Sequence, residues 1–149
     1  DTRKTLPGLR FLQRYAVRVG GCFNHRNDLS SGILIKENHI RGAGSLEAAI
    51  KAVKAKAPHT LRIEIEVTNF DELKRSLDAG ADIIMLDNMT PYEISEAVTL
   101  TKGRAILEAS GGITLSNVRA YAEAGVDIIS TGALTHSVKA ADISLLLKE

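Results

Sequence analysis

Charged side chains lie at the ends of several short apolar stretches of this sequence. Lys36 ends GILIK, Glu66 lies near the end of LRIEIEV, and Asp87 directly follows DIIML. Carboxylates at neighbouring strand ends can hold Mg²⁺, which prefers oxygen ligands and is shared with substrate phosphates. We therefore interpret Glu66 and Asp87 as a candidate site for a metal and a ribose, with paired structural charges as the alternative.

A set of cationic side chains lies mainly in short polar segments. It comprises Arg3, Lys4, His25, Arg26 and Lys36. Guanidinium groups bind carboxylate or phosphate bidentately, so several cations at one rim would suit a small, multiply charged anion. For any one of these residues, a solvated basic face is the simpler interpretation. The short polar segments DTRKT and NHR, however, do not belong to a helix with an exposed face, so we favour binding.

Two glycine turns follow consecutive predicted strands. Ser110, Gly111 and Gly112 form the first turn, and Gly132 lies in the second. Backbone N–H groups in such turns bind phosphate, although glycine also ends strands for steric reasons alone. His136 follows the second turn and could donate to a phosphate or carry a proton, whereas a lone histidine near a helix start is more often a surface or capping residue.

The elements that must position these side chains alternate between short apolar strands and amphipathic helices. This order is typical of an α/β protein with a parallel sheet. The clearest strand is Leu61–Val67, whose period of two separates apolar side chains from Glu64 and Glu66. Glu64 lies deeper than Glu66, so we expect it to be a structural ion-pair partner. The other predicted strands span residues 32–36, 82–86, 105–109 and 126–130.

Capping residues, glycine and proline mark the helix boundaries. We predict one helix from near Pro7 to about Val17, and a second over 46–57 with Ser45 as its N-cap. Two further starts have capping-box spacing, in the pairs Asn69 with Glu72 and Thr90 with Glu93. The segments AGADII and AGVDII echo each other at helix-to-strand junctions, as repeated β/α units would.

The count is about five β/α units in 149 residues, whereas a closed eight-fold barrel needs on the order of 250 residues. We therefore predict a TIM-like (β/α) barrel that is incomplete or smaller than eight-fold. A doubly wound sheet is the competing fold, but the sequence has no GxGxxG or GxxxxGK[ST] loop to support it. In a barrel, the charged residues above would meet at the carboxyl ends of the strands.

Composition narrows the classes of partner. The net charge is +1 and no long basic run occurs, so we expect no nucleic-acid partner. The single cysteine, Cys22, excludes an internal disulfide. No apolar stretch approaches the roughly 18 residues that span a bilayer, so we expect no membrane partner and a cytoplasmic location.

Seven motifs in order along the chain resemble those of one enzyme family. They are DTRKT, GGxxNHR, LIKENHI, IEIEV, AGADIIMLDN, EASGGI and STGALTHS. The chain is similar to the C-terminal barrel domain of quinolinate phosphoribosyltransferases. The resemblance implies transfer of a phosphoribosyl group from phosphoribosyl pyrophosphate to quinolinate with decarboxylation, which gives nicotinic acid mononucleotide, pyrophosphate and CO₂.

The same resemblance implies roles for the residues above. The two quinolinate carboxylates would be held by four cations: Arg3, His25, Arg26 and Lys36. Lys4 would lie near the pyrophosphate and the reacting centre, while Glu66 and Asp87 would orient the ribose and its Mg²⁺. The 5-phosphate would be bound by residues of the two glycine turns and the following histidine: Ser110, Gly111, Gly132 and His136.

The family also has a separate N-terminal α/β sandwich domain and forms homodimers or larger homo-oligomers. We therefore expect residues 1–149 to be the C-terminal catalytic domain of a longer protein, inactive by itself if the missing domain is needed. One alternative is a related enzyme acting on nicotinate, whose single carboxylate fits Arg3, Arg26 and Lys36 less well than a diacid. Another is a non-catalytic barrel fragment that binds phosphorylated ligands.

Overall fold

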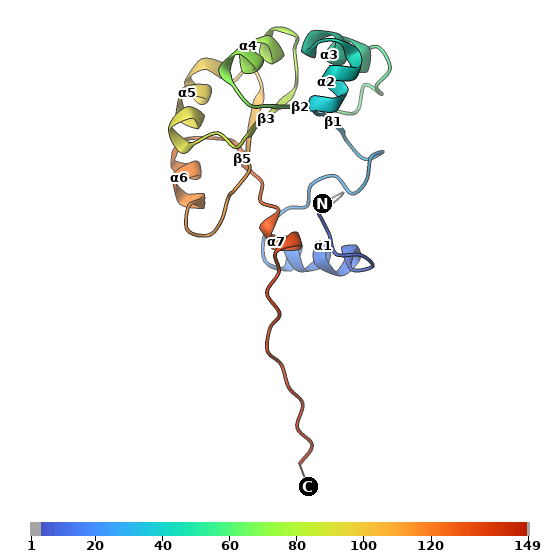
Figure 1. Cartoon of the computed structure of the whole chain (residues 1–149), viewed down its shortest axis with the longest axis vertical. Helices are drawn as coiled ribbons and strands as arrows, with labels where there is room; N and C mark the ends of the chain where they lie inside the picture. The colour runs from blue at the N-terminus through green and yellow to red at the C-terminus, as the bar shows by residue number, and fades with distance from the viewer. Residues whose placement is uncertain (1–3, 149) are drawn as a thin grey trace.

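A parallel sheet of five strands forms the centre of the computed structural model, which describes residues 4–148 (Figure 1). The strands are β1 (Ile33–Ile35), β2 (Ile63–Val67), β3 (Ile83–Asp87), β4 (Ile106–Ser110) and β5 (Ile128–Ile129). The helices are α1 (Arg10–Val19), α2 (Glu37–Ala43), α3 (Leu46–Lys54), α4 (Phe70–Asp78), α5 (Pro91–Thr101), α6 (Val118–Glu123) and α7 (Ala133–His136).

The strands lie in the order β1-β2-β3-β4-β5, so each strand pairs with the next one along the chain. The predicted α/β class and parallel sheet are confirmed. The sheet is open, however, because β1 and β5 do not pair with each other within residues 4–148. The described strands thus form a parallel sheet and no closed barrel, since there are five short strands and the last has only two residues.

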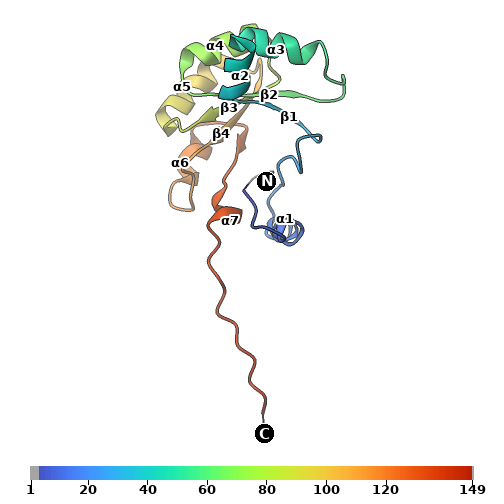
Figure 2. The same ribbon diagram turned by 45° about the vertical axis from the view of Figure 1, so that its right-hand side comes forward.

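Helices α2 to α6 all cover one face of the sheet, and the turned view shows the same layer (Figures 1 and 2). The apolar side chains of β2 point into this layer, as the alternation predicts, and Ile65 is fully buried. Ile65 is in register with Ile84 of β3, which in turn is in register with Leu107 of β4. These rows pack against the helices and form the core.

The opposite face of the sheet carries charged residues at the alternate positions. Glu66 of β2 is in register with Met85 of β3, and Met85 is in register with Glu108 of β4. Glu64 lies on the same face two residues before Glu66. We call this the inner face.

Three helices differ from the prediction, and one of them, α3, ends at Lys54 instead of residue 57. The helix expected from Pro7 begins at Arg10, because Gly8 has a φ of 74° and the chain forms a turn there. Helix α2, directly after Lys36, was not predicted, since its seven residues are too short for a clear periodicity. The backbone N–H of Lys36 donates to His39 Nδ1 at 2.9 Å and orients the start of this helix.

The predicted N-caps are confirmed. Glu93 N–H donates to Thr90 Oγ1 at 3.3 Å, and the Glu93 carboxylate accepts from Thr90 N–H at 2.7 Å, which completes a capping box. Asn69 Oδ1 accepts from Glu72 N–H at 2.9 Å, but the Glu72 carboxylate binds the N–H of Thr68 instead of that of Asn69. Ser45 caps α3 through the Ala48 N–H.

Helices α1 and α7 lie side by side, on the side of the sheet away from α2–α6 (Figures 1 and 2). A hydrogen bond joins them: Gln13 Nε2 donates to the carbonyl of Thr135 at 2.9 Å, across 122 residues of sequence. Residues 137–148 then run in an extended conformation away from the sheet (Figure 1). Over residues 4–148, we find no helix with both the length and the apolar character needed to cross a membrane.

The two AGxDII segments, residues 79–84 and 124–129, have the same structural role. Gly80 and Gly125 follow helix ends with φ values of 74° and 88°, a conformation that favours glycine. The aspartate two residues later accepts a hydrogen bond from the first residues of the preceding strand. Asp82 Oδ2 accepts from Ile63 N–H at 2.7 Å, and Asp127 Oδ2 accepts from Leu107 N–H at 2.8 Å.

We expect Asp127→Ala to destabilise the fold by about 1–3 kcal/mol, because the Leu107 N–H loses its acceptor at the start of a buried strand. Asp127→Asn keeps an oxygen acceptor and should cost less than half of this. Urea unfolding followed by circular dichroism measures both variants. Equal losses in the two variants would contradict the role assigned to the hydrogen bond.

Candidate active site

Three predicted residues meet at the carboxyl ends of β1, β2 and β3. Lys36 directly follows β1, and its Nζ forms an ion pair with Glu66 Oε2 of β2. Both side chains are largely buried, with exposed fractions of 29% for Lys36 and 20% for Glu66. An ion pair at this depth is screened less by water than a surface pair, so it restrains the direction of the Lys36 side chain.

Asp87, the last residue of β3, belongs to the same group. Burial raises its pKa, and the negative charge of Glu66 raises it further. The Asn88 amide, which donates to Asp87 Oδ2 at 2.9 Å, and the charges of Lys36 and Lys4 oppose this increase in pKa. Two carboxylates this close repel each other, and a divalent cation between them would relieve the repulsion. Glu66 and Asp87 therefore suit the metal that the sequence predicts.

Lys4 comes close to the second glycine turn, which joins β5 to α7. A Cβ atom placed on Gly132 would lie 2.8 Å from His136 Nε2 and 3.1 Å from Lys4 Cδ. The backbone angles of Gly132 do not require glycine, but a larger side chain here would have to displace the His136 ring. The tertiary structure thus brings together three predicted residues, Lys4, Gly132 and His136, that are separated by up to 132 positions.

The first glycine turn packs against the end of β3. Gly111 has a φ of 95°, and a Cβ atom on it would lie 2.8 Å from the backbone nitrogen of Asn88. Asn88 N–H also donates to the carbonyl of Ser110 at 2.9 Å, and Ser110 is in register with Asp87. This turn therefore lies directly beside the candidate metal-binding carboxylates.

His25 lies over the inner face, where it contacts carboxylates of β2 and β4. Its Nε2 is 3.4 Å from Glu64 Oε2 and 3.8 Å from Glu108 Oε1. Glu64 thus contacts a histidine and forms an ion pair with it only when the imidazole is protonated. Burial raises the pKa of Glu108, and the hydrogen bond from Ser130 Oγ, at 2.5 Å, opposes that rise.

Arg26 and Arg3 complete the predicted cations. Arg26 Nη1 donates to the carbonyl of Gly32 at 3.1 Å, which places the guanidinium beside the entry to β1. Arg3 lies outside the described residues. The grouping of His25 with Glu64 and Glu108 was not predicted, although the even spacing of Glu64 and Glu66 already places both on one face of β2.

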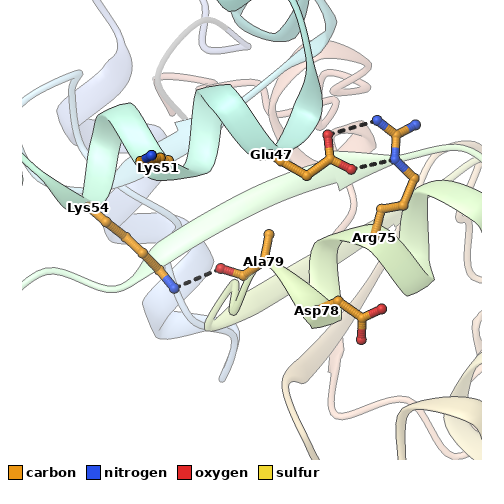
Figure 3. A pocket seen from close by; sticks show the side chains of 6 residues that line it. All are labelled: Glu47, Lys51, Lys54, Arg75, Asp78 and Ala79. Atoms are coloured by element: carbon orange, nitrogen blue, oxygen red, sulfur yellow. Dashed lines mark hydrogen bonds and ion pairs between the residues drawn. The ribbon is translucent and has the colours of Figure 1, made fainter.

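The hollow between α3 and α4 is remote from this chemistry (Figure 3). Arg75 donates to both oxygens of Glu47 at 2.6 and 2.9 Å, and Lys54 Nζ donates to the carbonyl of Ala79 at 2.8 Å. The Arg75 hydrogen bonds lower the pKa of Glu47 to about 2. We interpret these contacts as the connection between two neighbouring outer helices.

We expect Asp87→Asn to stabilise the chain at pH 7 by about 0.5 kcal/mol, a small effect because solvent screens this partly exposed group. The pKa of Asp87 is raised in the folded state, so the aspartate chain loses stability as pH rises through that pKa. The difference in unfolding free energy between the unaltered chain and the Asp87→Asn variant should therefore disappear below about pH 3.5.

Urea unfolding at pH 3 and pH 7 tests this, with Asp142→Asn in the exposed C-terminal segment as the control. A destabilised Asp87→Asn variant at pH 7 would contradict the repulsion between Asp87 and Glu66.

We expect Gly111→Ala to destabilise the chain by about 2 kcal/mol or more, because the methyl group meets the Asn88 backbone and the φ of 95° is strained for alanine. Gly103→Ala is the matched control, since Gly103 also has a positive φ, of 72°, but has open space around it. It should cost about 1 kcal/mol. Equal costs in urea unfolding would show that the contact with Asn88 is unimportant.

Comparison with known proteins identifies relatives of this chain. Residues 1–146 match the quinolinate phosphoribosyl transferase C-terminal domain. The chain is 49% identical over 145 residues to a probable nicotinate-nucleotide pyrophosphorylase (carboxylating) of Bacillus subtilis, covering 97% of this chain and 50% of that protein. A counterpart from Methanocaldococcus jannaschii is 50% identical over 151 residues, which cover 97% of this chain and 53% of that protein.

Solved structures agree with this relationship. NadC from Streptococcus pyogenes superimposes with a TM-score of 0.88 at 45% identity, over 95% of this chain and 50% of that one. The chain thus spans about half the length of the relatives that it matches. The match over nearly all of its residues shows that the chain belongs to the family of quinolinate phosphoribosyl transferase C-terminal domains.

Proposed function

We propose that this chain provides the phosphoribosyl-transfer site of a quinolinate phosphoribosyltransferase. The reaction moves the 5-phosphoribosyl group of phosphoribosyl pyrophosphate to the ring nitrogen of quinolinate, with decarboxylation, and yields nicotinic acid mononucleotide, pyrophosphate and CO₂. The observation that carries this proposal is the group at the strand ends, where the Lys36–Glu66 pair lies beside Asp87 and within electrostatic reach of Lys4. Names of the relatives, nicotinate-nucleotide pyrophosphorylase (carboxylating), support the same reaction.

The acceptor end of the site is cationic. Lys36 and His25 are both positioned by carboxylates, and Arg26 lies beside the start of β1. Together with Arg3, these cations would bind the two carboxylates of quinolinate and hold its nitrogen towards the ribose. Nicotinate has a single carboxylate and would leave part of this cationic set without a partner, so we favour the diacid.

The donor end combines carboxylates with a cation. Bond breaking at the ribose develops positive charge on the sugar, which the carboxylates of Glu66 and Asp87 would stabilise. The same two residues would hold Mg²⁺, which supplies positive charge to the departing pyrophosphate when bound. Lys4, beside Gly132, would contribute to binding that leaving group.

The two glycine turns would bind the 5-phosphate. Ser110 and Gly111 adjoin the end of β3, and Gly132 and His136 adjoin Lys4. Backbone N–H groups in such turns are suitable phosphate donors.

The complete enzyme would extend beyond this chain. We infer that the open sheet is a section of a TIM-like barrel, because its strands are in sequential order with the helices on one face. An N-terminal α/β sandwich domain, a homodimer or larger homo-oligomer, and a cytoplasmic location belong to the same proposal. Large apolar side chains on α1 support further contacts, since Phe11, Tyr15 and Val19 are 80%, 63% and 68% exposed.

We expect the chain to bind quinolinate at least tenfold more tightly than nicotinate in calorimetric titrations. Arg26→Ala should weaken quinolinate binding by about 1.5–3 kcal/mol, the value of a hydrogen bond to a charged group, and should abolish most of the preference. Arg119→Ala is the matched control, since this arginine is 87% exposed on the outer helix α6.

A preference for nicotinate, or an Arg26→Ala variant that binds quinolinate like the parent, would contradict the assigned acceptor. Release of CO₂ after addition of phosphoribosyl pyrophosphate and Mg²⁺ distinguishes a catalytic chain from a binding module. Binding without turnover would favour the module for the isolated chain.

A further inference from the structure

Three side chains of metal-ligand type converge on the inner face of the sheet. They are His25, Glu64 and Glu108, and one nitrogen or oxygen from each lies within 4.8 Å of the others. Glu64 belongs to β2 and Glu108 to β4, while His25 comes from the segment before β1. Three separate parts of the chain therefore deliver donor atoms to one point.

The carboxylates of this cluster are buried, and His25 contacts both of them. Glu64 and Glu108 are only 6% and 3% exposed. His25 Nε2 lies 3.4 and 3.8 Å from their oxygens, beyond the roughly 2.7–3.2 Å of an N–H···O hydrogen bond. An imidazole carries at most one positive charge, so it cannot neutralise two carboxylates.

One oxygen gives an independent indication of a ligand. Glu64 Oε1 is buried and has no hydrogen-bond partner among residues 4–148, and the Glu64 side chain as a whole is only 8% exposed. Buried polar atoms in folded proteins are nearly always paired with protein, water or an ion. The cluster thus has an acceptor available for a bound cation.

We propose that His25, Glu64 and Glu108 bind a divalent cation of the first transition series. One such ion neutralises both carboxylates and uses the unpartnered oxygen of Glu64. A donor set of one imidazole and two carboxylates suits Mn²⁺, Fe²⁺, Co²⁺ or Zn²⁺, whereas Mg²⁺ favours an all-oxygen set. Ser130 Oγ, which donates to Glu108 Oε1 at 2.5 Å, orients this carboxylate from outside the donor set.

This site differs from the one proposed at Glu66 and Asp87. The pair at the strand ends, Glu66 and Asp87, contains no imidazole, and its neighbouring cation is Lys36. The inner cluster includes His25, and its two carboxylates are more deeply buried than that of Glu66. His25 belongs to both proposals, as a cation towards quinolinate and as a neutral ligand towards the ion, but the ion would bind in the absence of any substrate.

Titration of Co²⁺ into the metal-free chain tests the proposal. We expect one tight site per chain by calorimetry, with visible absorption bands of a Co²⁺ ion bound by protein ligands. Glu64→Gln and Glu108→Gln keep the side-chain shape but remove the charge, so each should weaken Co²⁺ binding at least tenfold. Circular dichroism establishes that the variants are folded.

Two controls locate the ion. Glu96→Gln changes an exposed carboxylate on α5, and His59→Ala removes an exposed histidine; neither should alter the Co²⁺ affinity more than twofold. In proton NMR of the Co²⁺-loaded chain, the ring protons of His25 should show paramagnetic shifts that are absent from His25→Ala. This measurement uses the unaltered chain and remains decisive if a glutamine variant fails to fold.

Absence of a stoichiometric Co²⁺ site would overturn the proposal, and so would Co²⁺ binding that is lost in Glu66→Gln but retained in Glu64→Gln. Unshifted His25 resonances in the Co²⁺-loaded chain would also overturn it. Because no substrate is present in these experiments, their failure leaves the quinolinate titrations unaffected. The two proposals can therefore fail independently.

Discussion

The alternation of side chains along the parallel strands is the constraint on which the rest of the structure depends. A strand presents successive residues to opposite faces, so β2 must place Ile65 and Glu66 on different sides of the sheet. The helices cover the apolar side and remove Ile65 from water. The other side must then accommodate carboxylates, and the fold uses them for ion pairs and for the candidate site.

Carboxylates on the inner face have a cost in stability. Burial raises the pKa of Glu108, and burial together with Glu66 raises that of Asp87. Ion pairs with Lys36 and His25 compensate part of this cost. Residues whose ionised form is disfavoured in the free protein are suited to bind cations, because the ligand then relieves a repulsion that the fold maintains.

The site also depends on contacts between distant parts of the chain. Gln13 on α1 donates to the carbonyl of Thr135 on α7, and the side chain of Lys4 lies beside Gly132. These contacts lie on the side of the sheet opposite the α2–α6 layer (Figures 1 and 2). The residues assigned to pyrophosphate and to 5-phosphate binding therefore share one small region, although the first precedes the sheet and the others follow its last strand.

The sequence by itself determined the α/β class, the strand faces and most helix starts. These features follow from local chemistry: the period of two in IEIEV, the Thr90–Glu93 capping box and the glycine that ends a helix each act within a few residues. The residue types at the strand ends also sufficed to nominate Lys36, Glu66 and Asp87. Helix α2 and the true start of α1 were missed, because seven residues give little periodicity and a single positive φ at Gly8 moves a boundary.

Only the tertiary structure decided which of these residues meet. The register of β2, β3 and β4 aligns Glu66 with Met85 and Glu108, and no local pattern specifies which residues of adjacent strands are partners. Likewise, the approach of His25 to Glu64 and Glu108 depends on how the segment before β1 crosses the inner face. The open sheet has the same origin, since closure of a barrel requires pairing between edge strands, a long-range interaction that periodicity does not encode.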